Sequence, residues 1–112
     1  MKVYLICPVR NVTEEQQIEI DTYAKQLENN GIIVHNPKYD APQDDPTGFI
    51  ICETHLNAMK NSDEVHVFWD VSSKGSHFDL GMAFALNKKV IIAKLYQDDN
   101  VGKSYVKVMQ QM

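Results

Sequence analysis

Short apolar runs rich in β-branched residues alternate along this chain with longer stretches in which apolar residues recur at helical spacing. The runs that predict buried strands lie at residues 2–7, 32–34, 65–69 and 89–95. Helical spacing predicts a helix in each interval between them, and a further short helix from about residue 103. Strands and helices in this order form right-handed crossovers and a mostly parallel sheet with helices on both faces.

Capping residues set the limits of the predicted helices. Thr13 with Gln16 three residues later forms a capping box, and Asn30-Gly31 ends that first helix. Thr47 can cap the second helix. The apolar faces of the second and third helices are Phe49, Cys52, Leu56 and Met59, and Phe78, Met82, Ala85 and Leu86. We expect both to cover the sheet, although the face of the second helix would also suit a dimer seam.

We therefore expect residues 1–112 to form one α/β domain of the flavodoxin-like, doubly wound class, with four to five mostly parallel strands. In such sheets ligands bind beyond the carboxyl ends of the strands, where the connecting loops gather. The loop Asn36 to Thr47 holds three prolines and three aspartates, and a loop of this length is usually functional. Arg10, this loop and the turn at Gly75-Ser76 should share one cleft.

Charge and composition exclude several classes of partner. The net charge is −4, and six carboxylates between Asp40 and Glu64 face a single base, Lys60. A nucleic-acid polymer is therefore an unsuitable partner, because its binding needs a basic stripe. No apolar run approaches the ~20 residues of a membrane helix. Two cysteines and no cleavable signal pattern indicate a reduced, cytoplasmic setting.

Asp79 is the first candidate for chemistry, and two interpretations stay open for it. Ser76 with Asp79 three residues later can form another capping box at the start of the third helix. Alternatively, a carboxylate held there in a cleft can attack the anomeric carbon of a ribose-like sugar. The amides of Gly75, Ser76 and His77 would point out of the helix N-terminus beside Lys74. They suit a phosphate or a hydroxyl-rich ligand, or bind only the serine hydroxyl and water.

Arg10 is the only arginine, since the other ten basic residues are lysines. Its planar guanidinium can bind a phosphate or carboxylate through two donors, and it follows the first strand, where ligands bind. The four histidines show no metal-ligand spacing, so we expect no metal. His66 alternates with buried valines and should be a satisfied strand histidine. Cys7, before Pro8, should be a buried, inert thiol.

Three segments together resemble the nucleoside 2-deoxyribosyltransferase family, which includes the 2′-deoxynucleoside 5′-phosphate N-hydrolases. They are Val-Tyr-Leu-Ile-Cys-Pro-Val-Arg at 3–10, the segment 56–67, and Gly-Ser-His-Phe-Asp-Leu-Gly-Met-Ala-Phe-Ala-Leu at 75–86. The last is similar to the family's catalytic segment, in which a glutamate precedes Leu-Gly and a small residue. The resemblance covers most of the chain.

The resemblance implies roles for individual residues. Asp79 stands at the position of the family's nucleophilic glutamate, and Tyr4 near the tyrosine that assists it. The residues from Pro8 to Val12 would hold the base, and the backbone of Gly75 to His77 would hold the sugar or its 5′-phosphate. The resemblance also implies a nucleoside or nucleotide as partner, no metal or organic cofactor, and a homo-oligomer that shares sites between subunits.

This chain departs from the family pattern at three positions. Asp79 is one methylene shorter than glutamate, and misplacing a reacting group by ~1 Å can cost about 100-fold in rate. His55 stands where the family has the aspartate that handles the leaving base. Ser73 stands where it has a second carboxylate. His55 can act as a general acid, since histidine can be protonated near neutral pH, or it only lines the pocket.

Three hypotheses follow. The first is an N-glycosidase or deoxyribosyltransferase-like enzyme that cleaves the N-glycosidic bond of a nucleoside or nucleoside 5′-phosphate through Asp79. The second is a catalytically altered relative that binds a nucleotide-derived ligand without turnover. The third takes Asp79 as a helix cap in an interaction module.

Overall fold

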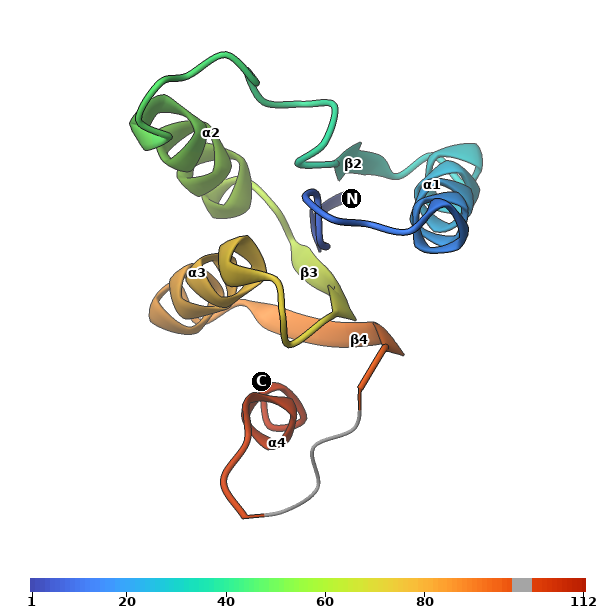
Figure 1. Ribbon diagram of the computed structural model, residues 1–112. Helices are drawn as coiled ribbons and strands as arrows, with labels where there is room; N and C mark the ends of the chain where they lie inside the picture. The colour runs from blue at the N-terminus through green and yellow to red at the C-terminus, as the bar shows by residue number, and fades with distance from the viewer. Residues whose placement is uncertain (98–101) are drawn as a thin grey trace.

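A computed structural model describes residues 1–97 and 102–112 as four strands and four helices that alternate along the chain (Figure 1). The strands are β1 (Lys2–Ile6), β2 (Ile33–His35), β3 (Glu64–Trp69) and β4 (Lys89–Leu95). The helices are α1 (Glu14–Asn29), α2 (Phe49–Lys60), α3 (Lys74–Ala85) and α4 (Tyr105–Met109). All described strands are parallel, in the order β2-β1-β3-β4, which confirms the predicted doubly wound α/β class with four strands.

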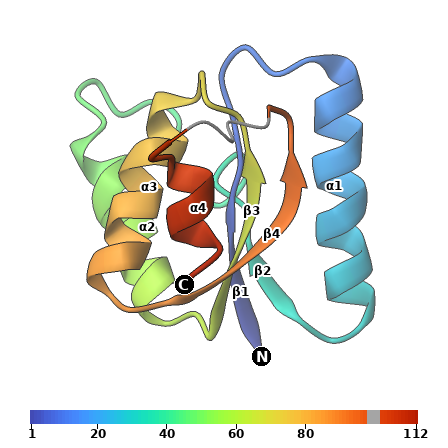
Figure 2. The same ribbon diagram turned by 90° about the horizontal axis from the view of Figure 1, so that it is seen from below.

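Helices cover both faces of the sheet. Figure 2 shows α1 alone on one face, and α2, α3 and α4 on the other. Successive side chains of a strand point to opposite faces, so Leu5 packs on the α1 side while Tyr4 and Ile6 pack on the side of the other helices. Burial on both faces explains why the central strands β1 and β3 are apolar almost throughout.

The first βα unit follows the sequence prediction closely. Thr13 Oγ1 accepts a hydrogen bond from the Gln16 amide at 3.1 Å, and the Gln16 side chain accepts one from the Thr13 amide at 3.1 Å. Gly31, with φ of 81°, follows the end of α1. The second strand lies one residue later than predicted, at Ile33–His35, because Ile33 pairs with Lys2 at the edge of the sheet. This shift places His35 in the strand.

The predicted caps of α2 and α3 were wrong. Gly48, with φ of 85°, is the N-cap of α2. Thr47 lies one residue before this cap, and its Oγ1 accepts from the Phe49 amide at 3.2 Å. Ser73 is the N-cap of α3, since its hydroxyl accepts from the Ser76 amide at 3.3 Å. The third helix therefore begins three residues earlier than a Ser76 cap requires. Asp79 consequently lies beyond the first turn, where a capping role is geometrically excluded.

The apolar faces of α2 and α3 only partly match the prediction. Met59 is fully buried, but Phe49 and Phe78 are 67% and 56% exposed. The residues that α3 buries are Ser76, Asp79, Leu80 and Ala83. A helix that turns small and polar groups toward the sheet leaves its aromatic residues outside, so Phe84 is also 63% exposed.

The C-terminal helix α4 begins at Tyr105, two residues later than expected, because the Ser104 hydroxyl caps it by accepting from the Lys107 amide at 3.2 Å. The turn predicted at Asp98-Asp99-Asn100 lies outside the described residues. Among the described helices, none has both the length and the apolar character needed to cross a membrane.

Candidate active site

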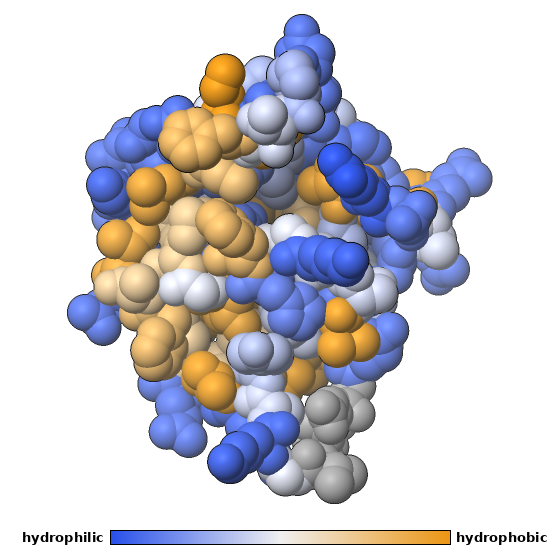
Figure 3. Space-filling view, turned by 60° about the vertical axis from the view of Figure 1, so that its left-hand side comes forward, coloured by the Kyte–Doolittle hydropathy of each residue, from blue (hydrophilic) through white to orange (hydrophobic). Residues whose placement is uncertain are grey.

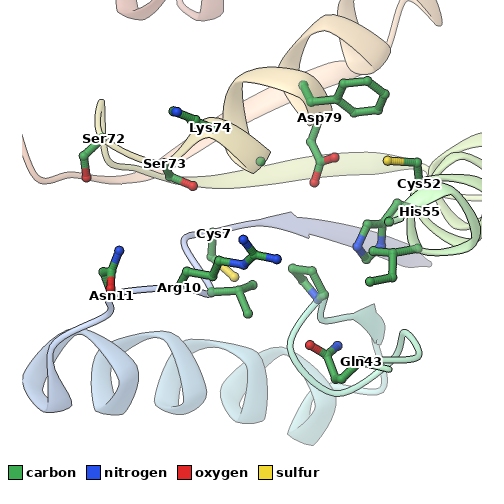
Figure 4. Close-up of a pocket in the computed structure, with 16 residues that line it drawn as sticks. Cys7, Arg10, Asn11, Gln43, Cys52, His55, Ser72, Ser73, Lys74 and Asp79 are labelled. Carbon is green, nitrogen blue, oxygen red and sulfur yellow. The ribbon is translucent and has the colours of Figure 1, made fainter. Parts of the chain in front are cut away.

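A pocket of about 550 Å³ lies beyond the carboxyl ends of β1 and β3 (Figure 4). The loop after β1, the loop 36–47, the first turns of α2 and the start of α3 form its walls. Its lining residues are Cys7, Val9, Arg10, Asn11, Pro37, Gln43, Gly48, Ile51, Cys52, His55, Ser72, Ser73, Lys74, Gly75, Phe78 and Asp79. The volume is typical of small-molecule sites. Arg10, the Pro/Asp loop and Gly75 therefore meet at one cleft, as the strand order predicts.

Asp79 and Tyr4 form a buried pair beneath this pocket. The Tyr4 hydroxyl donates a hydrogen bond to Asp79 Oδ2 at 2.9 Å, and Tyr4 is fully buried. Asp79 is 8% exposed. Burial raises the pKa of its carboxyl from the usual 3.8 to about 6, against the lowering effect of the Tyr4 hydrogen bond. The carboxylate is thus mainly ionised at pH 7, points into a pocket and has one oxygen fixed.

His55, in α2, forms part of the pocket wall. Figure 4 shows Asp79 and His55 both directed into the same space. His55 Nδ1 lies 3.0 Å from Nε2 of His35, at the end of β2. Burial, with the neighbouring His35 ring, lowers the pKa of His55 to about 4. Of the two interpretations of His55, a ring already protonated near neutral pH is therefore disfavoured, because a buried imidazole beside a second imidazole stays neutral there.

The cationic and polar groups of the pocket come from the loop after β1 and from the start of α3 (Figure 4). Arg10 and Lys74 both line the pocket. The amides of Lys74 and Gly75 are the first two of the helix and have no intrahelical partner. The sequence predicted free amides at Gly75, Ser76 and His77. The amides of Ser76 and His77 instead donate to the Ser73 hydroxyl and the Ser73 carbonyl, respectively, so the free amides are those of Lys74 and Gly75.

Several residues expected at the site lie outside the pocket lining. Pro8 is buried behind it, while Val9 and Asn11 reach it instead. Ser76 is 2% exposed, and its hydroxyl lies 2.8 Å from that of Ser73. His77 turns away, with its ring 4.7 Å from the ring of Trp69, and its Nδ1–H donates to the Ser73 carbonyl at 2.7 Å. The side chains of Ser76 and His77 therefore support α3.

Residues without a chemical signature in the sequence form the apolar wall. Ile51, Cys52 and Phe78 line the pocket, together with Pro37 from the long loop. In the sequence, only the length and composition of the loop 36–47 indicated that it contributes to a functional site. Burial raises the pKa of Cys7 to about 12, which agrees with the inert thiol expected there. Within residues 1–97 and 102–112, no three histidine, cysteine or acidic side chains are grouped so that they could hold a metal ion.

Comparison with solved structures finds this fold in several proteins of low sequence identity. One is a 2-deoxyribosyltransferase from Bacillus psychrosaccharolyticus, with a TM-score of 0.73 and 18% identity over 97% of this chain and 90% of the other. The chain shares that protein's fold. A CMP N-glycosidase from Clostridium botulinum has a TM-score of 0.68 and 20% identity, over 99% of this chain and 81% of its own.

A conserved protein from Enterococcus faecalis V583 has a TM-score of 0.67 and 17% identity, over 99% of this chain and 72% of its own. No family model and no curated protein matches the sequence. The likeness expected from the three sequence segments is therefore confirmed at the level of the fold.

Asp79→Asn should stabilise the protein at pH 8. The folded-state pKa of Asp79 lies above 3.8, so its burial costs stability fully above about pH 6 and not at all below about pH 4. The shift corresponds to about 3 kcal/mol. Asparagine keeps an oxygen that accepts from Tyr4. Urea unfolding at pH 8 and at pH 3.5 should show this gain at the higher pH only.

The exposed Asp44→Asn is the matched control and should change the free energy of unfolding by less than about 0.5 kcal/mol at either pH. A loss of stability in Asp79→Asn at pH 8 would contradict this account of the site.

Proposed function

We propose that this protein is an enzyme that cleaves the N-glycosidic bond of a nucleoside or nucleoside 5′-phosphate, with Asp79 as the nucleophile. The observation that carries the proposal is the buried Tyr4–Asp79 pair at the base of a ligand-sized pocket. A lone carboxylate in a partly enclosed site, with one oxygen already held, is suited to covalent attack on a sugar carbon. The shared fold with a 2-deoxyribosyltransferase and a CMP N-glycosidase supports the same chemistry.

The reaction would run in two steps. The free oxygen of Asp79 bonds to C1′ as the C1′–N bond breaks, and the electron pair of that bond leaves with the base. Tyr4 holds the other carboxylate oxygen and fixes the direction of attack. Water, or a second base in a transferase, then attacks C1′ and releases the carboxylate. Both the hydrolase and the transferase outcome use the same residues.

The shape of the pocket suggests how a substrate would lie. His55 and the apolar side chains of Ile51 and Phe78 form a side suited to a planar base. Arg10, from the loop after β1, and Lys74, at the start of α3, supply positive charge to the same pocket. A sugar placed over Asp79 would direct its 5′-phosphate toward these two cations and the free amides at the start of α3.

A second candidate function is binding of a nucleotide-derived ligand without turnover. It is favoured by the short side chain of Asp79, which is only 8% exposed, and by the absence of a second carboxylate among the pocket-lining residues. The pocket and its cations would serve such a sensor equally well. Release of free base from a bound nucleotide distinguishes the enzyme from the sensor.

We further propose that the protein works as a homo-oligomer in the cytoplasm. Apolar side chains gather over α2 and α3 in Figure 3, where Phe49, Ile50, Phe78 and Phe84 are each at least half exposed. A contiguous patch of this kind suits a protein interface. Because Phe78 also lines the pocket, a second copy seated there would complete its wall. Both cysteines are free, which fits a reducing compartment.

Wild-type protein, incubated with a panel of nucleosides and 5′-nucleotides, should release free base, and Asp79→Ala should abolish the release. Since attack requires the ionised carboxylate, kcat/KM should fall about 10-fold per pH unit below pH 6. Mass spectrometry would follow both free base and bound, intact ligand. Retention of an intact nucleotide without release by the wild type would favour the binding function and exclude glycosidic cleavage.

Arg10→Gln should lower kcat/KM for 5′-nucleotides by about 10- to 100-fold and leave kcat/KM for the matching nucleosides unchanged. Loss of one charge-assisted hydrogen-bonding group costs ~1.5–3 kcal/mol. Steady-state kinetics on a nucleoside and its 5′-phosphate measure the difference. Lys25→Gln, an exposed change on α1, is the control for altered net charge. Equal losses on both substrates would assign Arg10 to the sugar or the base.

Phe84→Glu should convert the oligomer to a monomer, because it places a charge on the exposed apolar face without touching the pocket lining. Sedimentation velocity at micromolar concentration measures the change. Ile18→Glu is the control, since Ile18 is 59% exposed on α1, on the other side of the sheet. A monomeric wild type would contradict the proposed assembly and leave the glycosidic chemistry standing.

A further inference from the structure

Two histidines from different elements share one hydrogen bond beside the candidate nucleophile. His35 ends β2 and His55 lies in α2, and the 3.0 Å contact joins Nε2 of the first to Nδ1 of the second. At that distance one nitrogen carries the hydrogen and the other accepts it. Each ring therefore fixes the tautomer of the other.

The outer nitrogens of the pair face two different environments. His55 lines the pocket, and its Nε2 has no protein partner within the described part of the chain. His35 is only half-buried, and among the described residues its Nδ1 likewise has no protein partner and is not enclosed. One end of the pair thus reaches the pocket and the other reaches solvent.

Both rings are neutral at pH 7. Burial lowers the pKa of His55, with His35 adding to the effect, and burial also lowers the pKa of His35 against the raising effect of Asp40. Tyr4 packs against both rings, stacked on His35 at 5.0 Å and edge-on to His55 at 6.0 Å between ring centroids. A neutral His55 is a poor general acid unless its proton is replaced from behind.

We propose that His35 and His55 form a neutral proton relay that carries a proton from solvent to the leaving base. This inference rests on the proposed function. His35 carries its hydrogen on Nε2 and donates to Nδ1 of His55, so His55 presents Nε2–H to the pocket. Neither ring needs to hold a stable positive charge.

In the first step, every proton that leaves the histidine pair is replaced by another. As Asp79 bonds to C1′ and the C1′–N bond breaks, His55 gives its Nε2 proton to the departing nitrogen. His35 gives its Nε2 proton to Nδ1 of His55, and a solvent proton enters at Nδ1 of His35. One proton enters and one leaves, and both rings finish neutral in the opposite tautomer.

The second step reverses the relay. In the opposite tautomer His55 Nε2 is an acceptor, which can take a proton from the water that attacks C1′. His55 then passes its Nδ1 proton to His35, and His35 releases its own Nδ1 proton to solvent. The original tautomers return when the C1′–Asp79 bond breaks. Tyr4 is a positioning residue for this cycle, because it contacts both rings and binds Asp79.

The test compares His35→Gln with His35→Phe. A glutamine amide can still donate to His55 Nδ1 but cannot pass a proton on, while phenylalanine keeps only the packing on Tyr4. We expect both to lower kcat for natural bases by about 100-fold, with KM changed less than twofold. His66→Gln is the control, since His66 bonds to Tyr23 and Glu64 on the α1 face.

An activated leaving group separates the relay from the rest of the reaction. A 4-nitrophenyl 2-deoxyriboside and its 5′-phosphate need no proton on departure. Both His35 variants should therefore release the first equivalent of nitrophenolate from the better of the two, in a pre-steady-state burst, at the wild-type rate. Asp79→Ala should still be inactive on it. Melting temperatures identify a variant that fails to fold, and in that case 15N NMR of the wild-type imidazoles decides. The His55 ring should stay uncharged from pH 6 to pH 8, and an imidazolium at His55 in that range would overturn the relay.

Other outcomes are also decisive. If His35→Gln keeps the wild-type rate on natural bases, the pair only positions His55 and the relay is wrong. Suppose that the wild type cleaves the nitrophenyl substrate and that this cleavage requires Asp79, while the His35 variants cleave nucleosides with natural bases as fast as the wild type does. The proposed function then holds, and the relay alone fails. If wild type cleaves neither kind of substrate, both fail.

Discussion

The hydrogen bond between Tyr4 and Asp79 is the contact on which the site depends. It joins residues 75 apart in the sequence, across the interface between β1 and α3. Tyr4 is fully buried, so its hydroxyl cannot exchange Asp79 for water without opening the core. The bond therefore fixes the rotation of α3 about its axis, which in turn directs Lys74, Gly75 and Phe78 toward the pocket.

This arrangement places polar groups where the fold would otherwise bury apolar ones. Ser76 and Asp79 occupy the face of α3 that covers the sheet, and His55 lies on the corresponding face of α2. Each is satisfied by a specific partner, as buried polar groups must be. The remaining cost is the charge on Asp79, which its raised pKa reports. Such a cost is characteristic of residues kept for chemistry.

Local sequence patterns predict the parts of this fold that local forces determine. The capping box at Thr13 and the limits of β4 follow from neighbouring residues alone, and both are confirmed. The start of α3 could not be fixed in this way, because Ser73 and Ser76 are equally good caps in isolation. Burial of Asp79 against Tyr4 favours the earlier cap, and that is a tertiary effect.

The same limit applies to the site. Strand order alone brings Arg10, the long loop and the start of α3 to one edge of the sheet, so the location of the cleft is predictable. His35 could not be found, since its part in the site depends on the one-residue shift of β2 and on the facing turn of α2. The outward direction of Phe78 was equally hidden, because Phe78 fits a sheet-facing pattern until Asp79 fixes the helix.

The charged side chains of the pocket are distributed unevenly. Its lining holds one acid, Asp79, and two bases, Arg10 and Lys74, while the histidine on the other side is neutral. A protonated His55 would attract an anionic substituent to the wrong side and lower the pKa of Asp79. Two imidazoles that share a hydrogen bond avoid both effects and still offer a donor or an acceptor to the ligand. In the proposed function, a neutral His55 would leave a 5′-phosphate only Arg10 and Lys74 to bind.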